Sequence, residues 1–319
     1  MHDTLIFLNL SDNNDFFLNS LYPFHLLSDD IMDQDELERG LVEAIRLAVT
    51  RVTSGTQKAL EEAVNREKKE GPKVQLEAIL ENIEVGKDES RPICQDTGTP
   101  TFFVEVGEYF EHTDLIKETI VNAVRTATEK IPLRPNAVHT IKHKNSGDNT
   151  GRFIPAIHWD VVDGDEAVIH VMPKGGGSEN MSKLVMMTPG KGLKGVKEIV
   201  LEHVAAMEGK ACAPTIIGVG LGGGSDMALE LAKKALLRPI GERHEEKEVA
   251  DIEEELLDKI NQLGVGPMGV DGETTVLDVK IEHAHRHPAS FPVAVVPQCW
   301  ANRQAEVKIS SDGKIEVIK

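Results

Sequence analysis

Three cysteines make up the whole cysteine complement of the chain, and their surroundings suit metal binding. They are Cys94 in RPICQDTGTP, Cys212 in GKACAPTIIG and Cys299 in VVPQCWANR. No two of them form a C-x-x-C pair, and each lies in a turn beside an apolar run. Three thiolates brought together from distant segments suit a [4Fe–4S] cluster in which one iron lacks a protein ligand and can act as a Lewis acid. The alternative is three buried thiols that behave as small hydrophobic side chains.

Polar side chains that could act on a bound molecule lie beside Cys94 and in a proline-rich turn. Gln95 and Asp96 follow Cys94 directly, so a metal group on Cys94 would place a carboxylate and an amide next to its ligand. Arg134, in LRPNAVHT, could bind a carboxylate through two parallel hydrogen bonds, although a surface arginine would look the same in the sequence.

Two GGGS segments share one local pattern, in VMPKGGGSENMSK and GVGLGGGSDMALE. Each is expected to follow a strand, begin a helix and expose backbone N–H groups that could bind an anion. Two glycine turns with serine caps and no ligand are the alternative. Gly218, Gly220 and Gly223 also satisfy G-x-G-x-x-G, but the later segment RPIGERHEEKEV is not a strand ending in an acidic residue. A dinucleotide site is therefore rejected.

Three histidines alternate along IEHAHRHP, at positions 283, 285 and 287. On a strand they would share one face and could bind zinc, but a polar patch at a strand end is the preferred interpretation for His283 and His285. His287 lies twelve positions before Cys299, and we expect it to reach the same site as the cysteines.

Composition excludes several classes of protein. The chain has 319 residues, 40% of them hydrophobic and 28% charged, and a net charge of −18. An acidic chain is a poor partner for nucleic acid or an anionic membrane, and no apolar run has the length of a membrane span. An odd cysteine count without a secretion signal favours a reducing, cytoplasmic compartment. Residues 1–31 differ in composition from the rest and are expected to form an N-terminal extension outside the fold.

The remaining residues, 32–319, predict one mixed α/β (α+β) domain that is helix-rich at its start, contains mixed sheets and is divisible into two lobes. Helices are expected from Asp33 to about Glu84 and over 114–131, and a strand over 99–107. The segment 153–176 predicts two strands joined by an Asp-Gly hairpin turn. Further along, helices and strands alternate up to about position 262, and the C-terminal part is strand-like.

The motifs PICQDTGTP, LRPNAVHT, KNSGDNTG, PKGGGSEN and HPASFPVAVVPQC, with the region around Cys212, together resemble the α-type catalytic domain of class I fumarate hydratases and L-tartrate dehydratases. The resemblance covers residues from about Met32 to the C-terminus, with all three cysteines in the expected motifs. It implies redox-neutral, reversible addition of water to a dicarboxylic acid by an Fe–S hydro-lyase that carries an oxygen-sensitive [4Fe–4S] cluster.

The resemblance also implies roles for individual residues. The three cysteines match the cluster ligands, and Asp96 and His287 match catalytic positions. The positions matched on the substrate side are Gln95, Arg134, Gly177 and, within the segment 180–186, Asn180 and Lys183. Single-chain members carry a second domain after the one resembled here. The chain therefore resembles the α subunit of the two-subunit form, and a β subunit in an α2β2 assembly is expected to supply the general base.

We therefore expect a tricarboxylic-acid-cycle fumarate hydratase subunit that interconverts fumarate and (S)-malate. An L-tartrate dehydratase α subunit is the alternative within the family. Two interpretations from other classes stay open at this point. An Fe–S electron-transfer or regulatory protein would usually have four protein ligands, and a zinc hydrolase built on His283 and His285 would leave the cysteines without a role.

Overall fold

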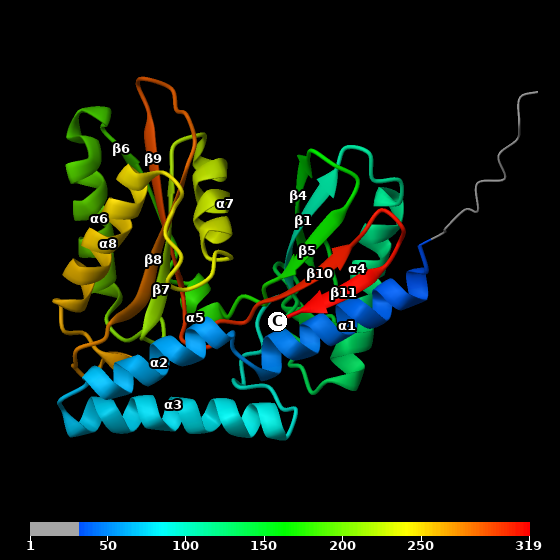
Figure 1. Ribbon diagram of the computed structural model, residues 1–319, viewed down its shortest axis with the longest axis horizontal. Coiled ribbons are helices and arrows are strands. Elements are labelled where there is room, and N and C mark those ends of the chain that lie inside the picture. Colours follow the sequence, from blue (N-terminus) through cyan, green and yellow to red (C-terminus); the bar gives the residue numbers. More distant parts are fainter. Residues whose placement is uncertain (1–31) are drawn as a thin grey trace, which may run out of the picture. The chain divides into compact units, whose positions relative to one another are not determined.

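The computed structural model describes residues 32–319, so the expected extension, residues 1–31, lies outside the described residues. The helices are α1 (Gln34–Thr50), α2 (Ser54–Arg66), α3 (Glu70–Asp88), α4 (Thr113–Lys130), α5 (Gly176–Glu179), α6 (Gly192–Met207), α7 (Ser225–Ala235) and α8 (Lys247–Asn261). The strands are β1 (Thr101–Gly107), β2 (Val138–His139), β3 (Lys144–Asn145), β4 (Ala156–Val162), β5 (Ala167–Val171), β6 (Lys183–Met187), β7 (Thr215–Leu221), β8 (Val276–His283), β9 (Phe291–Gln298), β10 (Ala305–Ile309) and β11 (Ile315–Ile318). Figure 1 labels most of them. The prediction of a mixed α/β fold is confirmed.

The first sheet has the strand order β11-β10-β5-β1-β4, and α1 and α4 cover it. Helix α1 begins at an N-cap, Asp33, whose side chain accepts hydrogen bonds from the N–H groups of Asp35 and Glu36. Its apolar residues recur at helical spacing and are fully buried, as at Leu37 and Leu41. The core of this layer therefore follows directly from the amphipathic pattern of the N-terminal helices.

The predicted hairpin between β4 and β5 is wrong. The Asp-Gly turn does reverse the chain, but β1 lies between the two strands, parallel to β4 and antiparallel to β5. The end of β1 packs against the Asp-Gly turn. Gly107 N–H donates to Glu166 O at 2.8 Å, and a Cβ on Gly107 would lie 2.4 Å from Gly164 O, so only glycine fits there. A turn motif specifies the reversal but not the strand that pairs with each arm.

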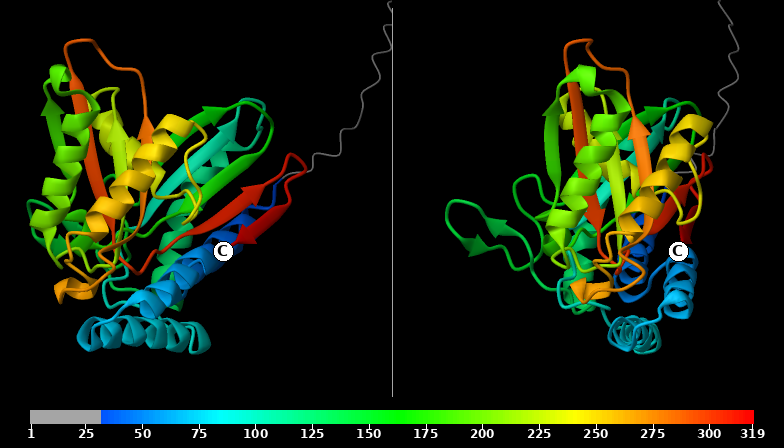
Figure 2. Two further views of the ribbon diagram at one scale, coloured as in Figure 1. Left: turned by 60° about the vertical axis from the view of Figure 1, so that its left-hand side comes forward. Right: turned by 90° about the vertical axis from the view of Figure 1, so that its left-hand side faces the viewer.

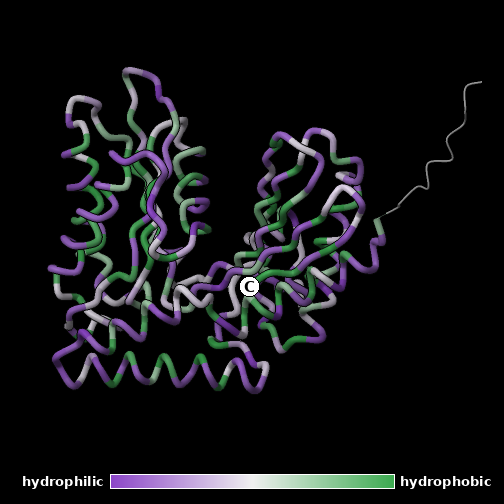
Figure 3. Tube along the Cα trace, in the orientation of Figure 1, coloured by the Kyte–Doolittle hydropathy of each residue, from purple (hydrophilic) through white to green (hydrophobic). Residues whose placement is uncertain are grey.

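The second sheet has the order β6-β9-β7-β8, with every residue of β7 and β9 buried. Helices α6 and α8 pack on one face and α7 on the other, and the apolar strands at its centre are visible in Figure 3. A Cβ on Gly218 or Gly220 would lie about 2 Å from a carbonyl oxygen of α7, at 2.0 and 1.9 Å respectively. These glycines therefore permit close helix–strand packing, which gives the G-x-G-x-x-G spacing a structural cause.

A short hairpin, β2–β3, forms a separate two-stranded sheet. Both of its strands are exposed, and Figure 2 (right) shows the hairpin extending away from the larger sheets. No helix among the described residues is both long and apolar enough to cross a membrane.

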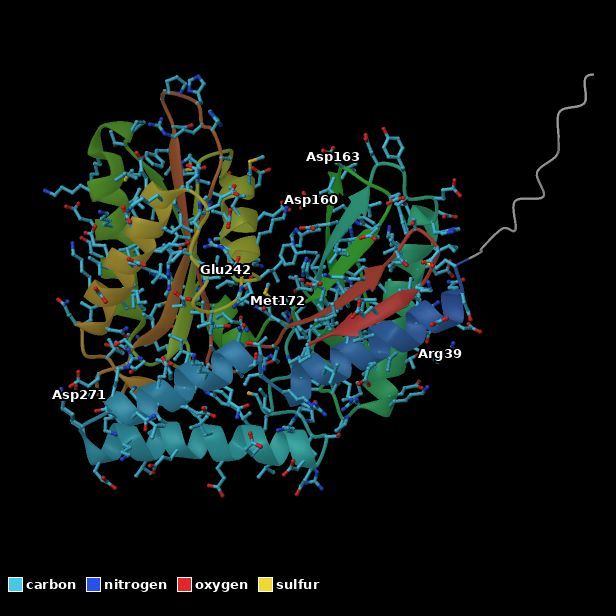
Figure 4. The ribbon with its side chains drawn as sticks, in the orientation of Figure 1. Arg39, Asp160, Asp163, Met172, Glu242 and Asp271 are labelled. Carbon is cyan, nitrogen blue, oxygen red and sulfur yellow. The ribbon has the colours of Figure 1, made fainter. Side chains whose placement is uncertain are left out.

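His158 on β4 connects the first sheet to α7. Its ring stacks on Phe103 with centroids 4.6 Å apart, and it lies 3.7 Å from Glu230 of α7. On the same strand, Asp160, labelled in Figure 4, pairs with Lys234. Burial of His158 lowers its pKa from the usual 6.5, and Glu230 opposes this only in part. The folded protein therefore binds fewer protons here than the unfolded chain does.

Because a lowered histidine pKa penalises the folded state at acid pH, we expect His158→Gln to reduce the loss of stability on acidification. The quantity to measure is the free energy of unfolding in urea at about pH 8 and about pH 5. The difference in the free energy of unfolding between wild type and His158→Gln should become smaller at the lower pH. His139→Gln, in the exposed hairpin, controls for the loss of a histidine. Parallel pH profiles for wild type and His158→Gln would contradict the assignment.

Candidate active site

The three cysteines lie in connections between helices and strands. Cys94 is in the connection between α3 and β1, Cys212 precedes β7, and Cys299 directly follows β9. Strands β7 and β9 pair antiparallel, with Ile216 opposite Gln298, so the start of β7 meets the end of β9. Beyond that pair, the N–H of Trp300 donates to the carbonyl of Cys212 at 3.3 Å. The sheet itself therefore brings Cys212 and Cys299 together.

Cys94 completes the group from the other sheet. Burial raises the pKa of the Cys212 thiol, and the charges of Cys299 and Cys94 raise it further, so the three sulfurs are electrostatic neighbours. Cys299 and Cys212 pack in the hydrophobic core that contains Met172, which is labelled in Figure 4. Cys212 has a φ of +58°, in the left-handed region, which is an unusual backbone conformation for a non-glycine residue.

The arrangement fits a cluster better than a single ion. Within residues 32–319, no group of three or more His, Cys, Asp and Glu side chains is placed to hold one metal ion. An iron–sulfur cluster bonds each thiolate to a different iron, so its ligands need not converge on one point. Three free thiols, half-buried or buried, with Cys212 near both of the others, are the donor set that such a cluster uses.

The carboxylate of Asp96 is fixed beside the thiols. Its Oδ1 accepts the N–H of Gly98 at 3.0 Å, and its Oδ2 accepts the N–H of Gly176 at 2.7 Å. The first GGGS segment does therefore present an N–H group to an anion, and here that anion is Asp96 itself. The helix that begins within this segment, α5, has only four residues and leads into β6. The second GGGS does precede a full helix, α7.

Arg134 is exposed, and its backbone is attached to the segment that follows Cys94. Its N–H donates to Thr97 Oγ1 at 3.1 Å, and its carbonyl accepts from Asn149 Nδ2 at 3.0 Å. Asn149 is 1% exposed, and its Oδ1 also accepts the N–H of Asn136. The loop NSGDNTG, part of one of the family-like motifs, therefore positions the turn that carries Arg134.

The other residues matched on the substrate side lie on two segments. Gln95 is exposed directly after Cys94. Gly177 is exposed within α5, where an added Cβ would have only Lys210 O in contact, at 3.8 Å. Asn180 caps α5 and Lys183 begins β6, both exposed. Gly176, next to Gly177, contacts Asp96, so α5 and the segment after Cys94 are neighbours.

His287 does not lie with the cysteines of its own chain. It is in the connection before β9, whereas Cys299 follows β9, and an extended strand of eight residues rises about 26 Å. The expectation that His287 reaches the site of the cysteines is therefore wrong for one and the same chain. The twelve positions between His287 and Cys299 include the whole of β9. His283 is also elsewhere: its Nε2 lies 3.0 Å from Glu246 Oε1, and its ring tilts against His244.

Two buried cations that the motifs do not predict lie beside the thiols. Arg303 is 1% exposed, and its Nη1 donates to Asp96 O at 2.7 Å. Lys174 is 2% exposed, and its Nζ donates to Ser178 Oγ and to Pro297 O. Burial lowers the pKa of Lys174 to about 8, although Glu179 and Cys299 oppose the shift. Their positions in the sequence could have indicated them, because both lie next to a candidate motif. Arg303 follows Cys299 by four residues, and Lys174 directly precedes the first GGGS.

Comparison with known proteins identifies the family. The chain matches the family model described as fumarate hydratase (fumerase) over residues 38–308. The "Putative L(+)-tartrate dehydratase subunit alpha" of Methanocaldococcus jannaschii is 45% identical over 279 residues, which cover 86% of this chain and 98% of that protein. The L(+)-tartrate dehydratase subunit alpha of Escherichia coli strain K12 is 38% identical over 241 residues, covering 75% and 80% of the two chains. The resemblance inferred from the motifs is confirmed: the chain belongs to the fumarate hydratase family of carbon–oxygen hydro-lyases.

Proposed function

We propose that residues 32–319 form the catalytic domain of an iron–sulfur hydro-lyase, with residues 1–31 as an extension outside it. In this proposal Cys94, Cys212 and Cys299 hold a [4Fe–4S] cluster. The observation that carries it is the convergence of three thiols from separate segments beside a fixed carboxylate and a buried arginine. An electron-transfer protein is the weaker candidate, because the family is one of hydro-lyases.

The reaction breaks a C–H bond next to a carboxylate and expels hydroxide from the neighbouring carbon. When bound, the cluster supplies a Lewis acid for the leaving oxygen. Arg134 would bind a substrate carboxylate, with Gln95, Gly177, Asn180 and Lys183 as further substrate contacts.

Asp96 would hold or move the proton at the leaving oxygen, because the N–H groups of Gly98 and Gly176 fix the direction of its carboxylate. His287 is left out of this set, since β9 separates it from Cys299 in the same chain.

A partner chain is part of the proposal. The two relatives compared above are named as alpha subunits, which supports a β subunit for this chain. The base that removes the C–H proton would then come from that subunit, and an α2β2 assembly would suit the two-fold symmetry common among oligomers. The substrate is a dicarboxylic acid, the partners include neither nucleic acid nor membrane, and the compartment is the cytoplasm.

For the substrate we propose the fumarate and (S)-malate pair of the tricarboxylic acid cycle. L-Tartrate is the second candidate, and the names of the relatives favour it, whereas the name of the family model favours fumarate. The two reactions differ by one hydroxyl on the carbon that loses its proton. Gln95, Asp96 and Arg134 would serve groups common to both substrates, so this chain contributes little to the choice between them.

We expect the complex with its β subunit to use (S)-malate or fumarate at least about a hundredfold better than L-tartrate. That factor corresponds to one desolvated hydroxyl left without a partner, at ~2–3 kcal/mol. The measurement is kcat/KM for each substrate, assayed anaerobically on one preparation. Equal or better use of L-tartrate would reverse the choice of substrate and leave the hydro-lyase assignment in place.

A further inference from the structure

Arg303 is a buried cation that forms no ion pair among the described residues, although the Asp96 carboxylate lies near the same glycine, Gly175, as its Nη2. Its side chain is 1% exposed, and its hydrogen bonds go to main-chain carbonyls: Nε to Pro173 O at 3.1 Å and Nη1 to Asp96 O at 2.7 Å. Neutral carbonyl groups satisfy N–H groups but do not cancel a full charge. A buried charge without an opposite charge is costly, so an anion is expected to occupy the space that Arg303 faces.

Two half-buried arginines of the chain, Arg238 and Arg243, lack this feature. Arg238 pairs with Glu253 at 2.9 Å and with Glu282 at 3.1 Å, and Arg243 pairs with Asp278 at 2.6 Å. Their charges are neutralised within the chain. Arg303 therefore differs from them in charge balance, and it is also more deeply buried.

The guanidinium also joins the segments that form the site. Arg303 follows Cys299 by four residues, and its hydrogen bonds reach Asp96, two residues after Cys94, and Pro173, just before the first GGGS. Its third nitrogen, Nη2, packs on Gly175, where an added Cβ would lie only 2.5 Å away. One side chain thus fixes the Cys94 segment, the Cys299 segment and the α5 turn relative to one another.

We propose that Arg303 is the positioning residue and the built-in counter-charge for the anionic group that the three cysteines hold. This inference rests on the proposed function, in which that group is an iron–sulfur cluster. Three thiolates add three negative charges to the cluster, and a fixed neighbouring cation stabilises them. A cation beside a cluster also favours the added electron on reduction, because net charge and hydrogen bonding help to set the reduction potential.

The test uses anaerobically purified wild-type protein and the variants Arg303→Met, which removes the charge at similar length, and Arg303→Lys, which keeps it. Iron release to a chelator and the midpoint potential of the cluster are measured for each. We expect Arg303→Met to release iron about 10- to 100-fold faster, the range found when groups supporting metal ligands are removed. The midpoint potential of Arg303→Met should be more negative than that of wild type. Arg303→Lys keeps the charge, so its potential should stay close to the wild-type value.

Arg238→Met is the control, because it removes a half-buried arginine whose partners, Glu253 and Glu282, are not among the cysteine segments. It is expected to lower the melting temperature and to leave iron release and potential unchanged. If Arg303→Met does not fold, Gly175→Ala replaces it, since the new Cβ displaces the guanidinium without removing its charge. Faster iron release in Gly175→Ala than in wild type then supports the proposal.

Wild-type iron release and potential in Arg303→Met, or wild-type iron release in Gly175→Ala where Arg303→Met does not fold, would overturn the role of Arg303 and leave the cluster assignment intact. A wild-type protein that carries no iron and sulfide would instead refute the proposed function, and this inference with it. The two failures are therefore distinguished by the wild-type analysis alone.

Discussion

Replacing any one of Cys94, Cys212 and Cys299 by serine is expected to abolish hydro-lyase activity and to remove most of the bound iron. A serine hydroxyl is nearly the same size as a thiol but is a poor ligand for the irons of a cluster, which is held by cysteine thiolates. Because the three thiols come from separate segments, no neighbouring cysteine can replace a lost ligand. Activity and iron content are measured on anaerobically purified variants reconstituted with the same β subunit.

Thermal unfolding of the iron-free proteins provides the control for these variants. A serine is close to cysteine in size, but its buried hydroxyl should lower the melting temperature of the iron-free chain by a few degrees while the unfolding transition stays cooperative. A variant that loses its iron but still folds shows that the lost activity results from the missing thiolate ligand and not from unfolding. A variant that keeps both a full cluster and full activity would remove that cysteine from the ligand set.

Adding the proposed β subunit is expected to have a second large effect, on turnover. The purified chain alone should be nearly inactive, and adding the β subunit should raise its turnover to that of the complete enzyme. The reason is chemical: removal of a weakly acidic C–H proton needs a positioned base, and in the proposed mechanism Asp96, oriented by two N–H groups, acts at the leaving oxygen instead. Turnover is measured for the chain alone, the β subunit alone and their equimolar mixture.

The mixing experiment has a matched control in the same chain. Asp96→Asn keeps the shape of the side chain, so it should still form the complex while losing most of the gain in turnover. Complex formation is measured by analytical ultracentrifugation. Turnover by the isolated chain at the rate of the complex would show that the base lies within these 319 residues.

Much of the fold could be predicted because local patterns determine it. The apolar spacing in α1 and α4 and the continuous apolar run of β7 specify one helix face or one buried strand, without any information from distant residues. The three cysteines could be selected for a similar reason, since a thiol beside a turn at the end of a strand is a local feature. Their mutual closeness was predicted only through the resemblance to a family.

The errors arose where distant parts of the chain decide the outcome. The strand β1 separates β4 from β5, and nothing in the sequence of the Asp-Gly turn encodes this insertion. His287 and Cys299 were expected together from their spacing, but an extended β9 places them at opposite ends of a strand. Arg303 was missed because its importance lies in burial and in the absence of a carboxylate partner among the described residues, and both depend on packing.

The iron and acid-labile sulfide content of the anaerobically purified chain tests the proposed cluster directly. We expect about four irons and four sulfides per chain, with the iron that lacks a thiolate lost first on exposure to air. The same analysis on the three serine variants should give far less of both. A chain that contains no sulfide, or that binds one zinc ion in place of iron, would contradict the cluster and with it the proposed mechanism.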